Sequence, residues 1–393
     1  MPFFNLRRLT MLVFFLQPVG FGSWLPRIPD VQHTLGLGPA ALALALLGLP
    51  CGTLLTLPFA GPLVGRIGPR VAMLIGFPLY TLAITLPALA PNATLLFAAL
   101  VLCGSTISFL ELGLNVEADS VEKSSGRLLM STSHGFWSLG IMTGSLIGSL
   151  LGGAGLAPHW AVPLVGIIVL PIALLAAYRL PAPIGPAAPT TATRPKFVPP
   201  SWALLGICLF VFGITMTEGA MADWSAIFMR DIMAADTTFA GLGYTIFALF
   251  VAAGRFFGDA LRVRFSSVPV ARACGVLALC GIGILYLAPN AAIALSGFGV
   301  AGLGASIGFP IAVSAAASLT DRPAASSVAV LSFVALVGFL VGPPMIGLVA
   351  EAFDIRLGLA ALVPFLVLSL LLARMLMPDA ATRGSEAQVP GVL

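Results

Sequence analysis

The chain has 393 residues, of which 59% are hydrophobic and only 9% are charged. A soluble protein of this length needs many more charged residues to cover its surface, so the composition excludes a soluble globular protein and predicts a polytopic membrane protein. The net charge of +4 is then explained by basic loops beside a membrane, and it does not indicate a nucleic-acid partner.

Apolar runs long enough to cross a bilayer as helices, at roughly 20 residues each, recur along the whole chain. The twelve predicted spans are 9–29, 39–64, 71–90, 93–117, 128–153, 159–178, 201–225, 238–261, 268–288, 291–318, 324–350 and 355–377. The runs are continuous and do not alternate polar with apolar residues, which favours helices over a β-barrel. We therefore predict an all-α membrane protein with twelve transmembrane helices.

The loop charges support this number of spans. With a cytoplasmic N-terminus, all nineteen basic residues except Arg27, Arg230 and Arg356 fall on the cytoplasmic side, as the positive-inside rule requires. This interpretation assigns Arg255, near the end of the eighth span, to the cytoplasmic side. Both termini are then cytoplasmic.

A proline-rich segment divides the spans into six and six. We predict an N-terminal six-helix bundle at 1–180, a cytoplasmic linker at 181–200, a C-terminal six-helix bundle at 201–378 and a disordered cytoplasmic tail at 379–393. The halves echo one another, since Trp24 and Trp224 lie 200 positions apart, as do Gln17 and Thr217. Two bundles related by a pseudo-two-fold axis are a transporter architecture, with the solute site at their interface.

Two ionisable residues lie inside the apolar runs on either side of a short charged turn. Glu111 and His134 are each about six residues inside their runs, roughly 9 Å from the boundary at 1.5 Å per residue. Ionisable groups at such depth are costly and mark functional sites. We expect Glu111 to bind the coupling proton with His134 as its partner. The alternative is a structural carboxylate hydrogen-bonded to a neighbouring helix.

Span seven carries two more acids, Glu218 and Asp223. Glu218 lies beyond the midplane and is a second candidate for proton coupling or for binding a polar or cationic solute. The two acids are about 140° apart around the helix and do not share a face. Asp223 and Arg27 lie near the outer ends of matching spans, so an Arg27–Asp223 ion pair is the predicted outer gate. The alternative is that the two charges snorkel without contact.

Aromatic and amide side chains on spans one, four, five and seven complete the candidate site. Aromatic residues at these positions stack on a solute or anchor helices at the membrane interface, and both readings stay open. The residues expected to contact the solute are Gln17, Phe21, Asn115, Trp137, Thr217 and Glu218.

The loop after span two, from Gly61 to Arg70, resembles the signature loop of the major facilitator superfamily, with Gly65 where the family usually has Asp. Gly258-Asp259, Arg262 and Arg264 resemble its copy in the second half. The resemblance implies gating roles for these loops. The gating residues are then Arg66, Arg70, Asp259 and Arg264, in addition to Arg27 and Asp223.

Two further patterns in the chain point to different branches of the superfamily. The glycines of span five, from Gly135 to Gly153, are similar to a motif of proton-linked drug antiporters, although small residues also simply let helices pack closely. The pattern from Asn115 to Gly140, with Gly126-Arg127, resembles a bacterial branch that includes rhizopine-uptake-like (MosC-like) permeases.

The resemblance implies a secondary active transporter in the bacterial inner (cytoplasmic) membrane, working as a monomer by alternating access. The expected solute is small, polar and organic (sugar-, inositol- or amine-like), moved as a proton-coupled symport. The alternative is a proton-driven drug or metabolite exporter. No GxxxxGK[ST] loop occurs and the three histidines are scattered, so we expect no enzymatic activity, cofactor or metal.

Overall fold

The computed structural model describes residues 3–125, 129–181 and 199–377. All regular structure within these ranges is helical, and twelve helical segments are long and apolar enough to cross a membrane. The predicted all-α fold with twelve spans is therefore confirmed. Residues 182–198 of the predicted linker and the predicted tail at 379–393 lie outside the described residues, and the predicted bundle boundaries stay a prediction.

The first six spans are built from eight α-helices, some joined by short 3-10 turns. They are α1 (Phe3–Trp24), η1 (Leu25–Arg27) and α2 (Ile28–Leu35); α3 (Pro39–Leu46) and α4 (Gly48–Ile67); α5 (Pro69–Thr85) and η2 (Leu86–Leu89); α6 (Ala93–Ser125); α7 (Met130–Gly153); and α8 (Pro158–Arg179). Spans one and four extend further than the apolar runs suggested, because polar residues continue the helices to Leu35 and Ser125.

The last six spans are built in the same way. They are α9 (Trp202–Asp231); α10 (Thr237–Phe265); α11 (Ser267–Leu287); α12 (Ala291–Ala305) and α13 (Gly308–Ala317); α14 (Ala324–Ala352); and α15 (Ile355–Ala360), α16 (Val363–Leu372) and η3 (Ala373–Leu376). Helix α9 continues past the predicted end of span seven to Asp231, a difference that places Arg230 on the helix.

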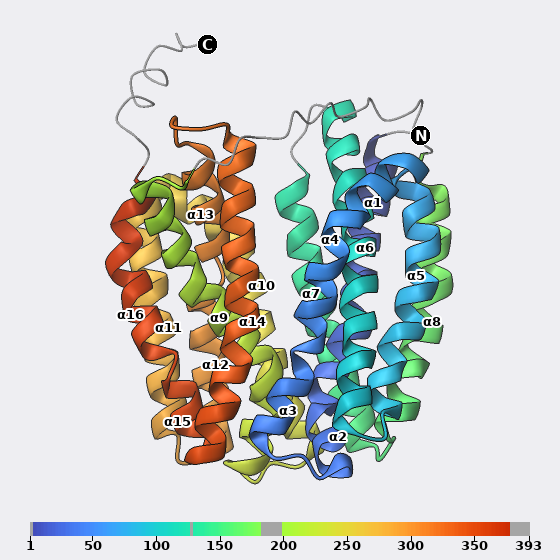
Figure 1. Ribbon diagram of the computed structural model, residues 1–393, viewed down its shortest axis with the longest axis vertical. Coiled ribbons are helices and arrows are strands. Elements are labelled where there is room, and N and C mark those ends of the chain that lie inside the picture. Colours follow the sequence, from blue (N-terminus) through green and yellow to red (C-terminus); the bar gives the residue numbers. More distant parts are fainter. Residues whose placement is uncertain (1–2, 126–128, 182–198, 378–393) are drawn as a thin grey trace.

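The helices form two bundles that stand side by side, with α1 to α8 in one and α9 to α16 in the other (Figure 1). Within each bundle neighbouring helices pack tightly, for example α1 on α7 and α9 on α14. The bundles meet chiefly where α7 packs on α10 and α3 packs on α14. Helices α2, α3 and α15 lie at one end of the molecule, which we call the closed end, and α1 begins at the other, the open end.

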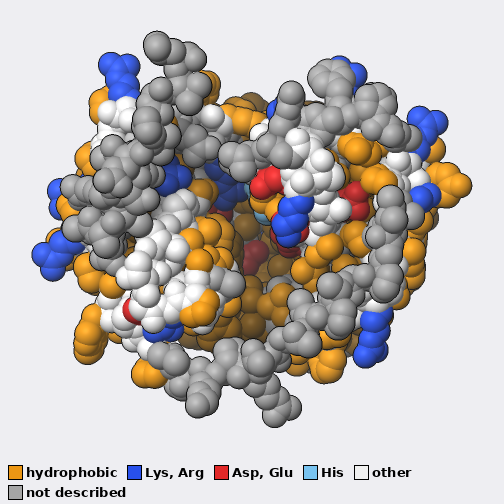
Figure 2. Space-filling view, turned by 90° about the horizontal axis from the view of Figure 1, so that it is seen from above, with side chains coloured by type: hydrophobic (Ala, Val, Ile, Leu, Met, Phe, Trp, Pro, Cys, Tyr) orange, Lys and Arg blue, Asp and Glu red, His pale blue; other side chains and the backbone are white. Residues whose placement is uncertain are grey.

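Seen from the open end, the molecule is hollowed at its centre, and acidic and basic side chains line the hollow (Figure 2). At the closed end the two bundles touch. There the backbone N–H of Ala40, at the start of α3, donates to Glu351 of α14 at 3.1 Å. The fold thus places a cavity between the bundles that is open at one end and sealed at the other.

Candidate functional site

A cavity between the bundles is lined by three charged side chains from the membrane spans, Glu218, Asp223 and Arg255. It encloses about 1290 Å³ of empty space, including the part open to solvent. Its walls come from α1, α3, α4, α6, α7, α9, α10 and α14. Most of the lining side chains are apolar or aromatic, so a few polar groups decide what the cavity can bind.

One wall of the cavity carries an ion pair between Glu218 of α9 and Arg255 of α10. The Nη2 atom of Arg255 lies 3.2 Å from Oε2 and 3.4 Å from Oε1 of Glu218. Both side chains are largely buried, with 19% and 16% of their surfaces exposed. Each charge therefore offsets the cost of burying the other.

Arg255 also joins this pair to two other helices. Its Nη1 donates to Ser138 Oγ of α7 at 2.8 Å, across the bundle interface. Its Nε donates to the carbonyl oxygen of Ser306 at 3.3 Å. That carbonyl lacks its helical donor because Pro310, four residues later, has no N–H, and the helix breaks here between α12 and α13. One guanidinium thus contacts both bundles.

The opposite wall is fixed by hydrogen bonds to α1. The indole N–H of Trp137 on α7 donates to Gln17 Oε1 of α1 at 2.8 Å. The backbone N–H of Phe21 donates to the hydroxyl of Tyr80 on α5 at 2.6 Å. These contacts hold the side chains of Gln17 and Trp137, and the backbone at Phe21, in one arrangement.

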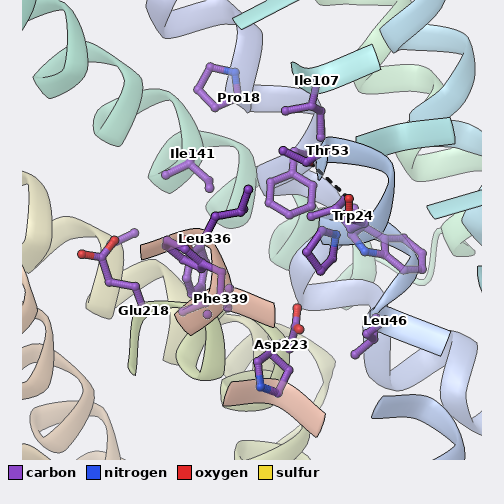
Figure 3. A pocket seen from close by; sticks show the side chains of 18 of the residues that line it. Pro18, Trp24, Leu46, Thr53, Ile107, Ile141, Glu218, Asp223, Leu336 and Phe339 are labelled. Carbon is purple, nitrogen blue, oxygen red and sulfur yellow. Dashed lines mark hydrogen bonds between the residues drawn. The ribbon is translucent and has the colours of Figure 1, made fainter. Parts of the chain in front are cut away.

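A second carboxylate, Asp223 of α9, lines the same cavity as Glu218. Its carboxylate has no hydrogen bond or ion pair with any residue that the structure describes. In Figure 3 the side chains of Asp223 and Glu218 lie apart, on different sides of Phe339. The cavity is wide enough to meet two faces of α9, so the expectation that these acids do not share a face is compatible with a shared cavity.

Four of the six residues expected to contact a solute line the cavity, namely Gln17, Phe21, Trp137 and Glu218. Thr217 does not, because it is fully buried and its hydroxyl donates to the carbonyl of Gly213 in its own helix at 2.9 Å. Asn115 lies outside the cavity lining as well, and its Nδ2 donates to the carbonyl of Glu111 at 3.0 Å.

The predicted partnership of Glu111 with His134 is not formed. The carboxylate of Glu111 has no hydrogen-bond or ion-pair partner among the described residues, and the ring of His134 packs edge-on against Phe14 at 5.5 Å. Their helices are consecutive but pack on different neighbours: α6 lies on α4 and α5, and α7 lies on α1 and α10. Equal depth in the membrane therefore does not bring the two side chains together.

The predicted Arg27–Asp223 pair is not formed either. Arg27 is buried, and its Nε donates to Asp30 at 2.7 Å, one turn along the chain. Its Nη2 donates to the carbonyl of Leu156 at 2.8 Å, within the same bundle. Local acceptors thus satisfy the guanidinium before it can reach α9.

A different arginine joins the bundles at the closed end. Arg230, in the last turn of α9, donates through Nη1 to the carbonyl of Pro29 at 2.6 Å and through Nη2 to Gln32 Oε1 at 2.8 Å. Pro29 and Gln32 belong to α2 of the other bundle. The sequence offered no clear signal for this contact, since Arg230 seemed to follow the seventh span.

The loops expected to gate the open end are less connected. Arg66 and Arg264 are exposed, and the guanidinium of Arg264 lies 5.3 Å from the ring of its neighbour Phe265. Arg70 lies over the ring of Tyr178 at 4.7 Å. The side chain of Asp259 lies outside what the structure describes. The gating roles of these residues stay predictions.

The glycines of span five pack α7 closely against α1. A Cβ atom on Gly144 would collide with the carbonyl of Val19, and one on Gly148 would collide with the carbonyl of Ser23. Small residues at these positions let the two backbones touch, as is common in membrane helices. Close packing, one of the two interpretations of the pattern, is therefore observed at these glycines, and the resemblance to drug antiporters stays a prediction.

The main residue that the sequence-based interpretation missed is Arg255. It was assigned to the cytoplasmic side although it falls within the predicted span 238–261, and the structure places it in the wall of the cavity. A charged residue inside an apolar run is a functional-site candidate by default, and that signal was available. Tyr244, about three turns earlier on the same face of α10, also lines the cavity.

Twelve apolar helices in two bundles around a central cavity define an all-helical, multi-pass membrane protein. The profile of the Major Facilitator Superfamily matches residues 10–322. An uncharacterised MFS-type transporter of Yersinia pestis is 32% identical over 342 residues, which cover 87% of this chain and 88% of that protein. The chain therefore belongs to the Major Facilitator Superfamily, a family of transporters.

Other similarities agree with this assignment. Membrane protein MosC of Rhizobium meliloti is 28% identical over 339 residues, which cover 86% of this chain and 82% of MosC. Among solved structures, the nucleoside transporter NupG gives a TM-score of 0.70 at 16% identity, over 95% of this chain and 98% of NupG.

The transporter FucP, solved in the outward conformation, gives a TM-score of 0.64 at 19% identity over 94% of this chain and 98% of FucP. At these identities the structural likeness shows the shared fold alone. The resemblance to the superfamily and to its MosC-containing branch is confirmed.

Proposed function

We propose that this protein is a secondary active transporter that moves a small polar organic solute across the bacterial inner membrane by alternating access, driven by protons. The observation that carries this proposal is the cavity itself. It lies between two bundles, is sealed at the closed end and open at the other, and holds a carboxylate–guanidinium pair in its wall. Rocking of the bundles around such a cavity would expose it to each side in turn.

The open end is proposed to face the cytoplasm. Basic residues gather at that end, in the α4–α5 and α10–α11 turns, whereas Arg27, Arg230 and Arg356 lie at the closed end. Positive residues favour the cytoplasmic side of a membrane. In this orientation the solute site is open to the cytoplasm, and both termini are cytoplasmic.

Glu218 is the proposed proton-coupling residue. When it is ionised, it holds Arg255 beside α9, and Arg255 in turn holds Ser138 of the other bundle. A proton on Glu218 would cancel the attraction for Arg255 and weaken this contact between the bundles. Proton binding and bundle movement would then share one set of atoms. Glu111 and His134 remain candidates for a second step, outside the cavity lining.

Solute contact is proposed for the polar groups that face the cavity from both bundles, namely Gln17 and Trp137 on one side and Glu218 on the other. Phe21 supplies an apolar ring beside them. Binding from both bundles is what alternating access requires, because a solute that touches both halves favours their movement together.

Export of an apolar drug or metabolite is the second candidate function. It is favoured by the many leucine, phenylalanine and proline side chains in the lining, which would accept a largely apolar solute. The direction of transport separates the two candidates.

Flux into proteoliposomes tests the proposal. Purified protein would be assayed with a panel of radiolabelled polyols, sugars and amines, with and without an imposed pH gradient. We expect gradient-driven flux in the wild type, and Glu218→Gln should lose accumulation while keeping exchange. Glu111→Gln is the matched comparison, a carboxylate on a membrane helix but outside the cavity. Accumulation lost in Glu111→Gln and kept in Glu218→Gln would overturn the assignment of the coupling site.

A further inference from the structure

The charges in the cavity wall do not balance. The lining contains three charged side chains, Glu218, Arg255 and Asp223. Glu218 and Arg255 form an ion pair, whereas Asp223 has no hydrogen bond or ion pair with any residue in the described ranges. A carboxylate in a largely apolar site without a partner is costly. The wall therefore has one acidic position whose positive partner must come from outside the chain.

The surroundings of Asp223 favour an organic cation as this partner. In Figure 3 the Asp223 carboxylate points into the space between Phe339 on one side and Trp24 and Leu46 on the other. A cation is attracted to the face of an aromatic ring. Phe339 is partly exposed, whereas only 1% of the Trp24 surface is exposed, so Trp24 forms the wall behind this space. The neighbours offer apolar and aromatic surface around one carboxylate.

The same surroundings argue against a bare metal ion. Calcium and magnesium require six or more oxygen ligands, supplied mainly by carboxylates, carbonyls and water. No group of three or more histidine, cysteine or acidic residues in the described part of the chain is placed to hold a metal. An ammonium group needs only one strong acceptor and carries an organic body that can contact Trp24 and Phe339.

Two of the polar donors around the cavity are already engaged; others, such as the Trp24 indole N–H and the Tyr244 hydroxyl, are neutral and cannot balance the charge of a carboxylate. The indole N–H of Trp224, next to Asp223 in the chain, donates to the carbonyl of Pro343 at 3.1 Å, and that of Trp137 donates to Gln17. Neither therefore compensates the carboxylate. Arg255 reaches Glu218, Ser138 and Ser306, which engages all three of its nitrogen atoms.

We propose that Asp223 binds the ammonium group of a small organic cation whose body lies against Trp24 and Phe339. This inference rests on the proposed transport function and narrows its solute to the amine class. Glu218 and Asp223 then have separate tasks: the first is held by Arg255, and the second recognises the charge of the solute.

Matched pairs of solutes test the assignment. Choline and 3,3-dimethylbutan-1-ol have the same shape and differ in charge, and glucosamine differs from glucose by one ammonium group. Binding to the purified full-length protein in lipid nanodiscs is read from tryptophan fluorescence, since Trp24 and Trp137 line the cavity. We expect glucosamine to bind roughly 10- to 100-fold tighter than glucose, as one hydrogen bond to a buried charged group implies. Choline has no N–H and meets the carboxylate through its charge alone, and it should also bind tighter than its neutral isostere.

Substitutions of single carboxylates test which one causes the preference for the charged solute. Asp223→Asn should reduce it to less than about threefold, because the amide keeps the shape and loses the charge. Asp223→Glu should retain most of it. Asp119→Asn is the control, because this exposed carboxylate at the open end pairs, among the described residues, with Lys123 of its own helix. Equal preference in Asp223→Asn and the wild type would overturn the inference, and so would the absence of any preference for the charged member.

The flux assay separates failure of this inference from failure of the transport function. If neutral solutes are accumulated equally well by the wild type and Asp223→Asn, and no amine is preferred, the transport function stands and the role of Asp223 is wrong. If amines bind through Asp223 but no solute crosses the membrane under any gradient, the binding site stands and the transport function is wrong.

The proton is the competing cation at this site. The other ionisable groups that line the cavity are Glu218 on α9 and Tyr244 and Arg255 on α10, and the lining residues from the remaining helices carry no ionisable side chain. Choline keeps its charge at every pH, so its binding reports only on the protein. We expect choline affinity to fall as the pH is lowered, because a protonated Asp223 is neutral. Affinity that rises on acidification would contradict the assignment.

Discussion

Replacing Arg230 by alanine should loosen the closed end of the transporter. Arg230 donates to the carbonyl of Pro29 at 2.6 Å and to Gln32 Oε1 at 2.8 Å, and both acceptors belong to the other bundle. The bundles must part here if the cavity is to open at this end. The substitution removes both hydrogen bonds from the closed state only. The ion pair of Arg230 with its neighbour Asp231 lies within one bundle, so its loss affects the closed and open states alike.

The size of the effect follows from these contacts. A hydrogen bond from a charged donor contributes about 1.5–3 kcal/mol when it is buried. The Arg230 side chain is 30% exposed, so water replaces part of each interaction, and we take about 1–2 kcal/mol for the two together. Because 1.4 kcal/mol is a factor of ten, the ratio of open to closed molecules should rise about 5- to 30-fold.

Distances between spin labels can measure this ratio. Cysteines introduced at Thr34 of α2 and Ala352 of α14 place labels on exposed positions of both bundles at the closed end, in a background without the five native cysteines. Double electron–electron resonance should show a longer-distance population that grows in Arg230→Ala.

Arg356 provides the matched control for this experiment. It is also an arginine at the closed end, and it donates to two carbonyls, of Tyr286 at 2.6 Å and Ala288 at 2.8 Å. Both acceptors lie in its own bundle, so Arg356→Ala should leave the distance distribution unchanged. If Arg230→Ala behaves like Arg356→Ala, the contact with α2 does not hold the bundles together and the reasoning fails.

Three further predictions concern the cavity and the packing around it. Arg255→Met leaves the Glu218 carboxylate buried without its partner, at a cost of about 3–5 kcal/mol. It should lower the midpoint of thermal unfolding in detergent more than the double substitution Arg255→Met with Glu218→Met does. Equal midpoints for the two variants would show that the ion pair does not stabilise the protein. Gly144→Ala places a Cβ against a backbone carbonyl of α1, whereas Gly283 has no atom within 4 Å of such a Cβ, so only the first substitution should lower the midpoint. Trp137→Phe removes the N–H that donates to α1 and should raise the KM for solute several-fold, and an unchanged KM would remove this side chain from the site.

Much of the architecture could be predicted because it depends on local properties of the chain. The length and apolarity of each run decide whether it crosses a membrane, and the twelve spans of the structure agree with those predicted. Four of the six expected solute contacts also line the cavity. Three of these four, Gln17, Phe21 and Glu218, lie on spans one and seven, which the internal repeat relates to each other.

The partners of the buried charges could not be predicted in the same way. Glu111 and His134 were paired because they lie at equal depth, but depth says nothing about which way a helix is turned. Arg27 was paired with Asp223 through the repeat, although Asp30, three residues away, is the nearer acceptor. A local partner costs less conformational entropy than a distant one, so it is preferred wherever the geometry allows it.

The sequence by itself determined the number of spans, their order, and the distribution of charge between the two ends, because hydrophobicity and charge act residue by residue along the chain. Only the tertiary structure decided that Arg255 neutralises Glu218 and leaves Asp223 alone in the cavity wall. That choice depends on how each helix is rotated, which small residues such as Gly144 and breaks such as that before Pro310 control through close packing. The rotation of a helix is a property of its contacts with its neighbours, and those contacts exist only in the folded bundles.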